Sequence, residues 1–133
     1  KSLPLTGTGD ETRDFTYVLD LVQGLLKGAF YEKAIGEAFN LASGRETKIK
    51  DMIAMVNHST GNSKPITQFP PRKWDTKKRL LASIELAGKL IDYKPIISFD
   101  DGLNENFKWF SNNWDKVKLS ADFPAGMSSA VRK

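Results

Sequence analysis

The chain has 133 residues and a mass of 14.9 kDa, the size of a single domain that buries roughly two thirds of its unfolded surface. Its hydrophobic fraction of 40% and charged fraction of 27% are ordinary for a globular protein, and no apolar run reaches the roughly 20 residues of a membrane span. The absence of cysteine and the single histidine exclude disulfides and thiolate metal sites and disfavour a Ser-His-Asp triad, while the net charge of +4 is too dispersed to predict nucleic-acid binding.

The first third of the chain predicts two extended segments and then a helix. Residues 3–6 are expected to be extended and to lead into a turn at 7–10, and residues 12–17 alternate in the manner of a second extended segment. From Val18 the apolar period becomes that of a helix, which ends near Glu32. Its apolar residues, which share one helical face, are Leu21, Val22, Leu25, Leu26, Ala29 and Phe30.

The middle third predicts a strand, a helix and a further strand. Residues 37–42 lie between two glycines and have the composition of a compact strand. Thr47 is expected to cap the helix, and Gly61 is expected to end it. Residues 65–69 form the next strand candidate, which leads into a double-proline loop. The apolar positions of the helix are Ile49, Met52, Ile53 and Val56.

The last third predicts two more helices. Ser83 is expected to cap a short helix that stops before Pro95, because the residue before a proline disfavours helical backbone. Ser98 and Asp101 have the spacing of a capping box that opens the next helix. The aromatic residues of that helix could form a stacking platform, but their helical spacing favours the core. The apolar and aromatic residues in question are Leu103, Phe107, Trp109, Phe110 and Trp114.

The alternation of strands and helices predicts an α/β fold with short strands and about four helices. The folded part is expected to cover residues 1–118. Residues 119–133 contain Ser, Ala and Gly without any period, and they are expected to form a separate C-terminal tail, either disordered or draped over another surface.

Two arginines are the sharpest candidates for a binding site. Arg13 lies where an extended segment runs into a helix, and Arg72 lies in the double-proline loop. Two such guanidinium groups can converge on a diphosphate, each through charge-assisted pairs worth about 1.5–3 kcal/mol. The alternative is local ion pairing. Arg13 would then pair with Asp14 or Asp20, and Arg72 would pair with Asp75. Surface arginines form such local ion pairs more often than they bind a phosphate.

Three other motifs have structural explanations. Gly7–Gly9 lacks the third glycine of a phosphate-binding loop and is followed by Asp10 and Glu11, which would repel phosphate, so a turn is expected. His58 is expected to be exposed near the end of a helix. Asp100–Asp101 is expected to serve helix capping and the helix dipole instead of acid–base chemistry.

Four segments, in this order, resemble the C-terminal part of extended short-chain dehydrogenase/reductases. More narrowly, they resemble nucleotide-sugar epimerases and dehydratases of the UDP-glucose 4-epimerase type. The segments are LPLTGTGDETRDFTYVLD (3–20), GEAFNLASGRETKIKDM (36–52), PPRKWDTKKRLLASIELAGKLIDYKP (70–95) and FDDGLNENFKWF (99–110). Their shared order and spacing favour the diphosphate interpretation of Arg13 and Arg72 over local ion pairing.

The resemblance implies roles for five residues. Arg13 and Arg72 would contact the diphosphate of a nucleotide sugar, and Asp75 would contact the ribose hydroxyls or the arginine beside it. Pro4 and Thr6 would offer a backbone carbonyl and a backbone amide to the edge of the nucleobase. Pro4 has no N–H, but a carbonyl acceptor is all that its position requires.

The resemblance also implies chemistry for which this sequence lacks the residues. The family transfers a hydride to and from NAD with a Tyr-x-x-x-Lys pair, whereas no lysine follows Tyr17, Tyr31 or Tyr93 by four residues, and no Gly-rich cofactor loop is present. The expectation is a sugar-nucleotide-binding fragment that lacks the N-terminal Rossmann half, is inactive alone and does not bind NAD tightly. The parent enzyme would be cytoplasmic and act in carbohydrate metabolism.

Two alternatives and one consequence accompany this expectation. The chain could instead be a stand-alone, non-catalytic nucleotide-sugar-binding or interaction module, or a small subunit that completes an enzyme in trans. Without a cofactor half, apolar surface near Phe39 and Leu41 is expected to be exposed, because a parallel sheet normally buries both faces. A homo-oligomer is therefore expected.

Overall fold

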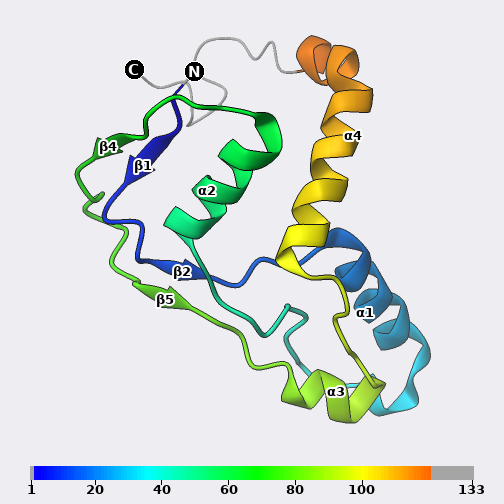
Figure 1. The fold of residues 1–133 in the computed structure, drawn as a ribbon. Coiled ribbons are helices and arrows are strands. Elements are labelled where there is room, and N and C mark those ends of the chain that lie inside the picture. Colours follow the sequence, from blue (N-terminus) through cyan, green and yellow to red (C-terminus); the bar gives the residue numbers. More distant parts are fainter. Residues whose placement is uncertain (1, 121–133) are drawn as a thin grey trace.

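The computed structural model describes residues 2–120, so most of the expected tail lies outside the described residues, while Leu119 and Ser120 belong to the last helix. Short strands and four helices make up the described chain, which confirms the expected α/β class (Figure 1). The elements are β1 (Pro4–Thr6), β2 (Thr12–Arg13), α1 (Val18–Phe30), the 3₁₀ turn η1 (Glu32–Ala34), β3 (Thr47–Lys48), α2 (Ile49–Thr60), β4 (Thr67–Phe69), β5 (Arg79–Leu80), α3 (Glu85–Ile91) and α4 (Phe99–Ser120).

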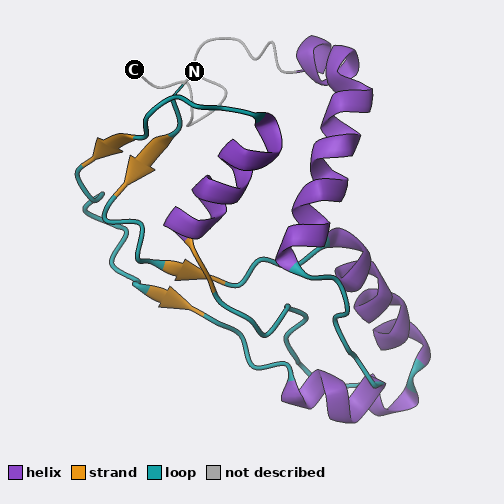
Figure 2. Cartoon of the chain, in the orientation of Figure 1, coloured by secondary structure: helices purple, strands orange, loops and turns teal. Residues whose placement is uncertain are grey.

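The strands form two small sheets. β1 pairs in parallel with β4, with Pro4 opposite Thr67, while β2 lies between an antiparallel β3 and a parallel β5. Figure 2 shows how much of the chain between these short strands is loop. Because strands of two or three residues form few ladder hydrogen bonds, the loops depend on side chains for their positions.

Two carboxylates hold the loops to the rest of the fold. Asp14 follows β2 and accepts hydrogen bonds from the backbone N–H groups of Ser43 (2.9 Å) and Gly44 (3.0 Å). Asp20 is only 4% exposed and accepts hydrogen bonds from the backbone N–H groups of Ile96 (3.1 Å) and Ile97 (3.0 Å). These bonds join the start of α1 to the loop before α2 and to the segment before α4.

Helix α1 packs through its small and polar face. Asp20 and Gly24 are buried, and a Cβ at Gly24 would lie within 2.8 Å of the ring of Tyr93. The apolar face points to solvent, with Leu25 59% and Phe30 81% exposed. The predicted apolar stripe therefore exists, but it does not face the core of the described chain.

Residues 37–42 form a loop, so the strand predicted there is wrong. Phe39 and Leu41 are half-buried against the cluster of Ala87, Ile91 and Tyr93, and the Tyr93 hydroxyl donates a hydrogen bond to the carbonyl of Ala42 (3.0 Å). The expected exposure of apolar surface at Phe39 and Leu41 is wrong as well, since the large exposed apolar face belongs to α1.

The helix boundaries agree with some capping predictions and contradict others. Thr47 lies in β3 and the N-cap of α2 is Lys48, while the N-cap of α3 is Ile84 in place of Ser83; both predicted caps are wrong. Gly61 ends α2 in the left-handed conformation (φ 62°), as predicted.

The predicted start of α4 is confirmed, since the Asp101 N–H donates to the Ser98 hydroxyl (3.1 Å). The expected burial of its aromatic residues is wrong: Trp109 is 54%, Phe110 41% and Trp114 58% exposed. Figure 1 shows α4 rising beside α2, and the two helices line an apolar groove of about 570 Å³. None of the helices within residues 2–120 is long and apolar enough to cross a membrane.

Candidate functional site

The five residues expected to bind a sugar nucleotide line one pocket of about 380 Å³. Pro4 and Thr6 come from β1, Arg13 comes from β2, and Arg72 and Asp75 come from the loop between β4 and β5. The remaining wall consists of Glu11 and of apolar side chains from residues 3–5 and from α2. These apolar residues are Leu3, Leu5, Ile49, Met52, Ile53 and Val56.

The backbone of β1 presents an unpaired edge at this pocket. The Leu3 carbonyl accepts a hydrogen bond from the Thr67 N–H, and the Gly7 N–H donates to the Phe69 carbonyl, both at 3.0 Å. Alternate residues of a strand direct their backbone groups to opposite edges, so the Pro4 carbonyl and the Thr6 N–H point away from β4.

Within the described residues β4 is the only strand paired with β1, which leaves this second edge without a strand partner. The edge therefore offers the Pro4 carbonyl as an acceptor and, two residues on, the Thr6 N–H as a donor. A planar group in the pocket that carries an N–H beside a carbonyl would complement both.

Arg13 is fixed by two contacts of its guanidinium group. Its Nη1 donates to the Thr12 carbonyl (2.7 Å), and its Nη2 forms an ion pair with Asp75 Oδ1 (3.1 Å). The Arg13 side chain is 22% exposed and that of Asp75 is 39% exposed. The local partners considered for Arg13 are wrong, because Asp14 and Asp20 instead accept hydrogen bonds from backbone N–H groups.

Arg72 is exposed at the rim of the pocket, where the Asp75 N–H donates to its carbonyl (3.1 Å) and closes a turn. The ion pair predicted between Arg72 and Asp75 is wrong, since Asp75 pairs with Arg13. Among the described residues, no carboxylate lies within ion-pair distance of the Arg72 guanidinium. The pocket thus contains one engaged guanidinium and one available guanidinium.

The glycine turn before β2 confirms the structural interpretation of Gly7–Gly9. Gly7 and Gly9 have φ values of +88° and +82°, and the Gly9 N–H donates to the Glu11 carboxylate (2.8 Å). The pKa of Glu11 is lowered, chiefly by a hydrogen bond from its own backbone N–H and then by those of Thr8 and Gly9. The amides of this turn already have an anionic acceptor within the chain.

Glu46 holds the sheet that carries Arg13, a role that the sequence did not indicate. Its carboxylate binds Arg79 of β5 in a bidentate manner (2.6 and 3.0 Å) and accepts a hydrogen bond from the Thr12 hydroxyl of β2 (2.5 Å). The hydrogen bonds from Arg79 and then from Thr12 lower the pKa of Glu46 from 4.5 to about 2. One side chain therefore joins β2 and β5, and it belongs to the residue directly before β3.

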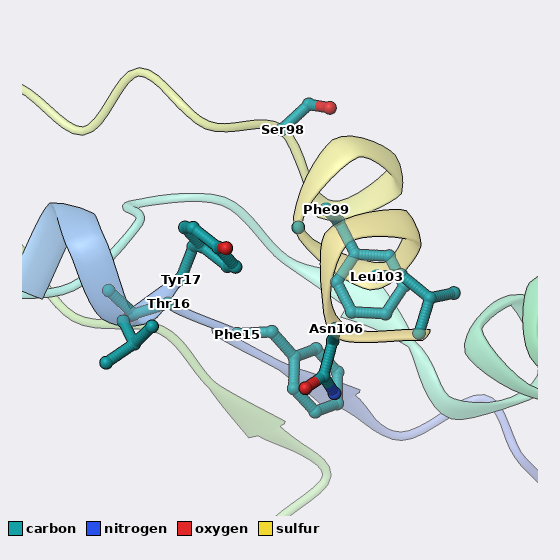
Figure 3. A pocket seen from close by; sticks show the side chains of 9 residues that line it. Phe15, Thr16, Tyr17, Ser98, Phe99, Leu103 and Asn106 are labelled. Carbon is teal, nitrogen blue, oxygen red and sulfur yellow. The ribbon is translucent and has the colours of Figure 1, made fainter. Parts of the chain in front are cut away.

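A second pocket, of about 280 Å³, contains none of the five predicted residues and lies between the end of the β2–α1 link and the start of α4. The rings of Phe15 and Phe99 lie 5.1 Å apart, and Tyr17 packs against Gly102. Figure 3 shows Phe15 and Phe99 close together with Tyr17 opposite them. Three aromatic side chains line this pocket, and their contacts hold the beginning of α4 beside the β2–α1 link.

Metal chemistry finds no support in the described residues. They contain no group of three His, Cys, Asp or Glu side chains that could hold an ion.

His58 is exposed near the C-terminal end of α2, as predicted. Ser98 and Asp101 form a helix cap, which confirms the structural interpretation of the acidic residues there.

No family model matches the chain. Among curated proteins, a UDP-glucose 4-epimerase from Cyamopsis tetragonoloba is 33% identical over 112 residues, which are 81% of this chain and 31% of that protein. UDP-glucuronic acid decarboxylase 1 from Danio rerio is 26% identical over 133 residues, 100% of this chain and 31% of that protein. The chain spans about a third of the length of the curated relatives that it matches.

The solved structures similar to this chain also include epimerases. An epimerase from Methanothermobacter thermautotrophicus superposes with a TM-score of 0.88 at 44% identity, over 90% of this chain and 36% of that one. The Thermotoga maritima UDP-glucose 4-epimerase with UDP-glucose has a TM-score of 0.78 at 25% identity, over 86% and 36%. The Bordetella bronchiseptica enzyme WbmF with NAD⁺ and UDP has a TM-score of 0.72 at 33% identity, over 89% and 34%.

These matches show that the chain is similar to the C-terminal portion of extended short-chain dehydrogenase/reductases. Within that family its relatives are UDP-sugar epimerases and decarboxylases. The resemblance predicted from the sequence is thereby confirmed.

The carboxylate of Glu46 gives a pH-dependent test of the sheet that holds Arg13. Because the pKa of Glu46 is about 2 in the folded chain and about 4.5 otherwise, its stabilising contribution is complete above pH 4.5 and is lost as the pH falls towards 2. We expect Glu46→Gln to lower the thermal midpoint at pH 7 and to flatten the loss of stability between pH 4.5 and 2, as measured by circular dichroism.

The matched control is Glu105→Gln, which removes an exposed partner of Lys108 on α4. It should reproduce the wild-type profile over the same pH range. A Glu46→Gln variant that loses stability with pH as steeply as the wild type would show that Glu46 does not join β2 and β5 in solution.

Proposed function

We propose that the chain forms the sugar-nucleotide-binding portion of an NAD-dependent nucleotide-sugar epimerase of the UDP-glucose 4-epimerase type. The observation that carries this proposal is the convergence of Pro4, Thr6, Arg13, Arg72 and Asp75 on one pocket from three separate segments. The named relatives include both epimerases and a decarboxylase of UDP-sugars. Binding of a UDP-sugar is therefore supported more broadly than the particular reaction.

The nucleobase would bind at the unpaired edge of β1. A residue of a parallel strand bonds to the carbonyl of one residue and to the N–H of the residue two positions on. The Pro4 carbonyl and the Thr6 N–H have this spacing, and a uracil ring carries an N–H beside a carbonyl. The base would take the place of one strand residue, with Met52 and Ile53 supplying an apolar wall.

The diphosphate would lie between Arg13 and Arg72. Arg13 approaches from the sheet and Arg72 from the rim, so that two guanidinium groups could bind different phosphate oxygens. Asp75, between them, would accept hydrogen bonds from the ribose hydroxyls. The sugar would then extend beyond the two arginines.

Hydride transfer would depend on residues outside this sequence, and the chain alone would be inactive. The sequence has no Tyr-x-x-x-Lys pair and no Gly-rich cofactor loop, and the relatives that it matches are about three times as long. NAD would bind mainly to the part of a complete enzyme that supplies those groups, and not tightly to this chain.

The competing function is a stand-alone, non-catalytic nucleotide-sugar-binding module, which would bind UDP-sugars without any catalytic partner.

Calorimetry with UDP and UDP-glucose tests the proposed site. We expect weak binding by the wild type and no measurable binding by the double variant Arg13→Ala with Arg72→Ala. Each lost charge-assisted pair is worth about 1.5–3 kcal/mol, or roughly ten- to a hundredfold in affinity. The double variant Lys33→Ala with Lys108→Ala removes the same charge from exposed positions outside the pocket and should bind like the wild type. Equal binding by the arginine variant would contradict the residue assignment.

We also propose that the exposed apolar face of α1 is an interface. In a complete enzyme it would pack against the Rossmann half, and in this chain alone it would pair with a second copy. The support is the exposure of large apolar side chains along one helix, far more than isolated surface residues would give. These side chains are Val18, Leu19, Val22, Leu25, Leu26 and Phe30.

Sedimentation velocity tests this interface. We expect the wild type to self-associate at high concentration and the variant Leu25→Lys with Phe30→Lys to sediment as a monomer with an unchanged helical spectrum. Both positions are more than half exposed, so the substitutions leave the core intact. A wild-type chain that remains a monomer at high concentration would exclude the self-association.

A further inference from the structure

We propose that Glu46 is a positioning residue for nucleotide binding, because it fixes the place of Arg13 relative to the loop that carries Arg72. Glu46 is not part of the pocket wall, so it acts on a ligand only through these two arginines. The inference rests on the proposed sugar-nucleotide site and adds to it a residue that lies outside the pocket.

The two arginines belong to separate segments that short backbone pairing joins. Arg13 ends β2, and Arg72 lies in the loop that leads into β5. These strands are two residues long, with Thr12 opposite Arg79. All residues from 63 to 81 are exposed, so little packing holds the loop in place. The separation of the two guanidinium groups therefore depends on what holds β2 against β5.

The Glu46 carboxylate holds these two strands together through both of its oxygens. Oε1 accepts hydrogen bonds from the Thr12 hydroxyl (2.5 Å) and from Arg79 Nε (3.0 Å), and Oε2 accepts one from Arg79 Nη2 (2.6 Å). A bidentate pair between a carboxylate and a guanidinium fixes orientation as well as distance. Arg79 is thereby oriented at the start of β5, and the Thr12 hydroxyl ties the same carboxylate to β2.

Thr12 carries this constraint to the Arg13 side chain. The Thr12 N–H donates to the Lys78 carbonyl (2.8 Å), and its hydroxyl donates to Glu46. Its carbonyl accepts a hydrogen bond from Arg13 Nη1 (2.7 Å). A shift of Thr12 would move the acceptor of this hydrogen bond, and the direction of the guanidinium in the pocket would change with it.

The substitution Glu46→Gln keeps the size of the side chain but cannot make the same three hydrogen bonds. A carboxylate accepts through two oxygens, whereas an amide has one acceptor oxygen and an NH₂ group that only donates. All the partners of Glu46 at these oxygens are themselves donors, from Thr12 and Arg79. The variant therefore loses part of the connection between β2 and β5 without leaving a cavity.

An NMR titration with UDP, at a temperature at which every variant is folded, tests this role. We expect Glu46→Gln to bind UDP about fivefold more weakly than the wild type, the effect of one hydrogen bond of ordinary strength. The Nε–H signal of Arg13 in the ligand-free protein should shift in the same variant. Thr12→Val removes the hydroxyl and should also weaken binding, whereas Thr12→Ser keeps the hydroxyl and should bind like the wild type.

The double variant Glu46→Gln with Thr12→Val distinguishes one shared connection from two independent ones. Because the two side chains are bonded to each other, the combined loss of affinity should be smaller than the product of the two single losses. Losses that multiply in full would overturn the role of Thr12 as the link between Glu46 and Arg13.

Tyr93→Phe is the control for a purely structural effect. It removes the hydrogen bond from the Tyr93 hydroxyl to the Ala42 carbonyl (3.0 Å) in the buried cluster, outside the pocket. It should lower the thermal midpoint and leave UDP affinity and the Arg13 signal unchanged. The same result for Glu46→Gln would overturn the proposal.

Failure of the proposed function gives a different result. In that case UDP binding survives the removal of Arg13 and Arg72 together, whatever the effect of Glu46→Gln. If the arginine variant loses UDP while Glu46→Gln and Thr12→Val bind it like the wild type, the site stands and the positioning role of Glu46 is overturned.

Discussion

Hydrogen bonds from backbone N–H groups to the carboxylates of Asp14 and Asp20 hold this fold together. The strands are two or three residues long, so they cannot position the long segments between them. Asp14 binds the loop before α2 and Asp20 binds the segment before α4, which anchors both to the end of β2 and the start of α1. Glu46 adds a third anchor by joining Thr12 to Arg79. Arg13 lies among these anchors, so its position follows from them.

The same anchors explain what the sequence could and could not predict. Local signals located the four helices, the Gly61 end of α2 and the Ser98 cap, because each depends on residues close in the chain. The prediction of a strand at 37–42 is wrong because no neighbouring strand pairs with these residues in the described chain. The conformation of an isolated extended segment is determined by its side-chain contacts instead. Glu46 carries no sequence signal, since its partners are brought to it only by the folded chain.

The candidate site was predictable for a different reason. The order and spacing of Arg13, Arg72 and Asp75 led to the expectation that they share a ligand, and the structure brings all three to one pocket with β1. What the sequence could not give is the pairing of Arg13 with Asp75 across the chain in place of a near neighbour. In this account, binding of the nucleotide and transfer of the hydride are separable: the described residues form the binding wall, and α1 exposes an apolar face where the rest of an enzyme would pack.

The central claim is that one nucleotide binds at the edge of β1 and between the two arginines, and an NMR titration with UDP tests it most directly. The account predicts that the backbone amide of Thr6 and the side-chain Nε–H signals of Arg13 and Arg72 shift together and saturate at the same concentration. Shifts confined to the aromatic pocket around Tyr17 and Phe99, with Thr6 and both arginines unaffected, would contradict it.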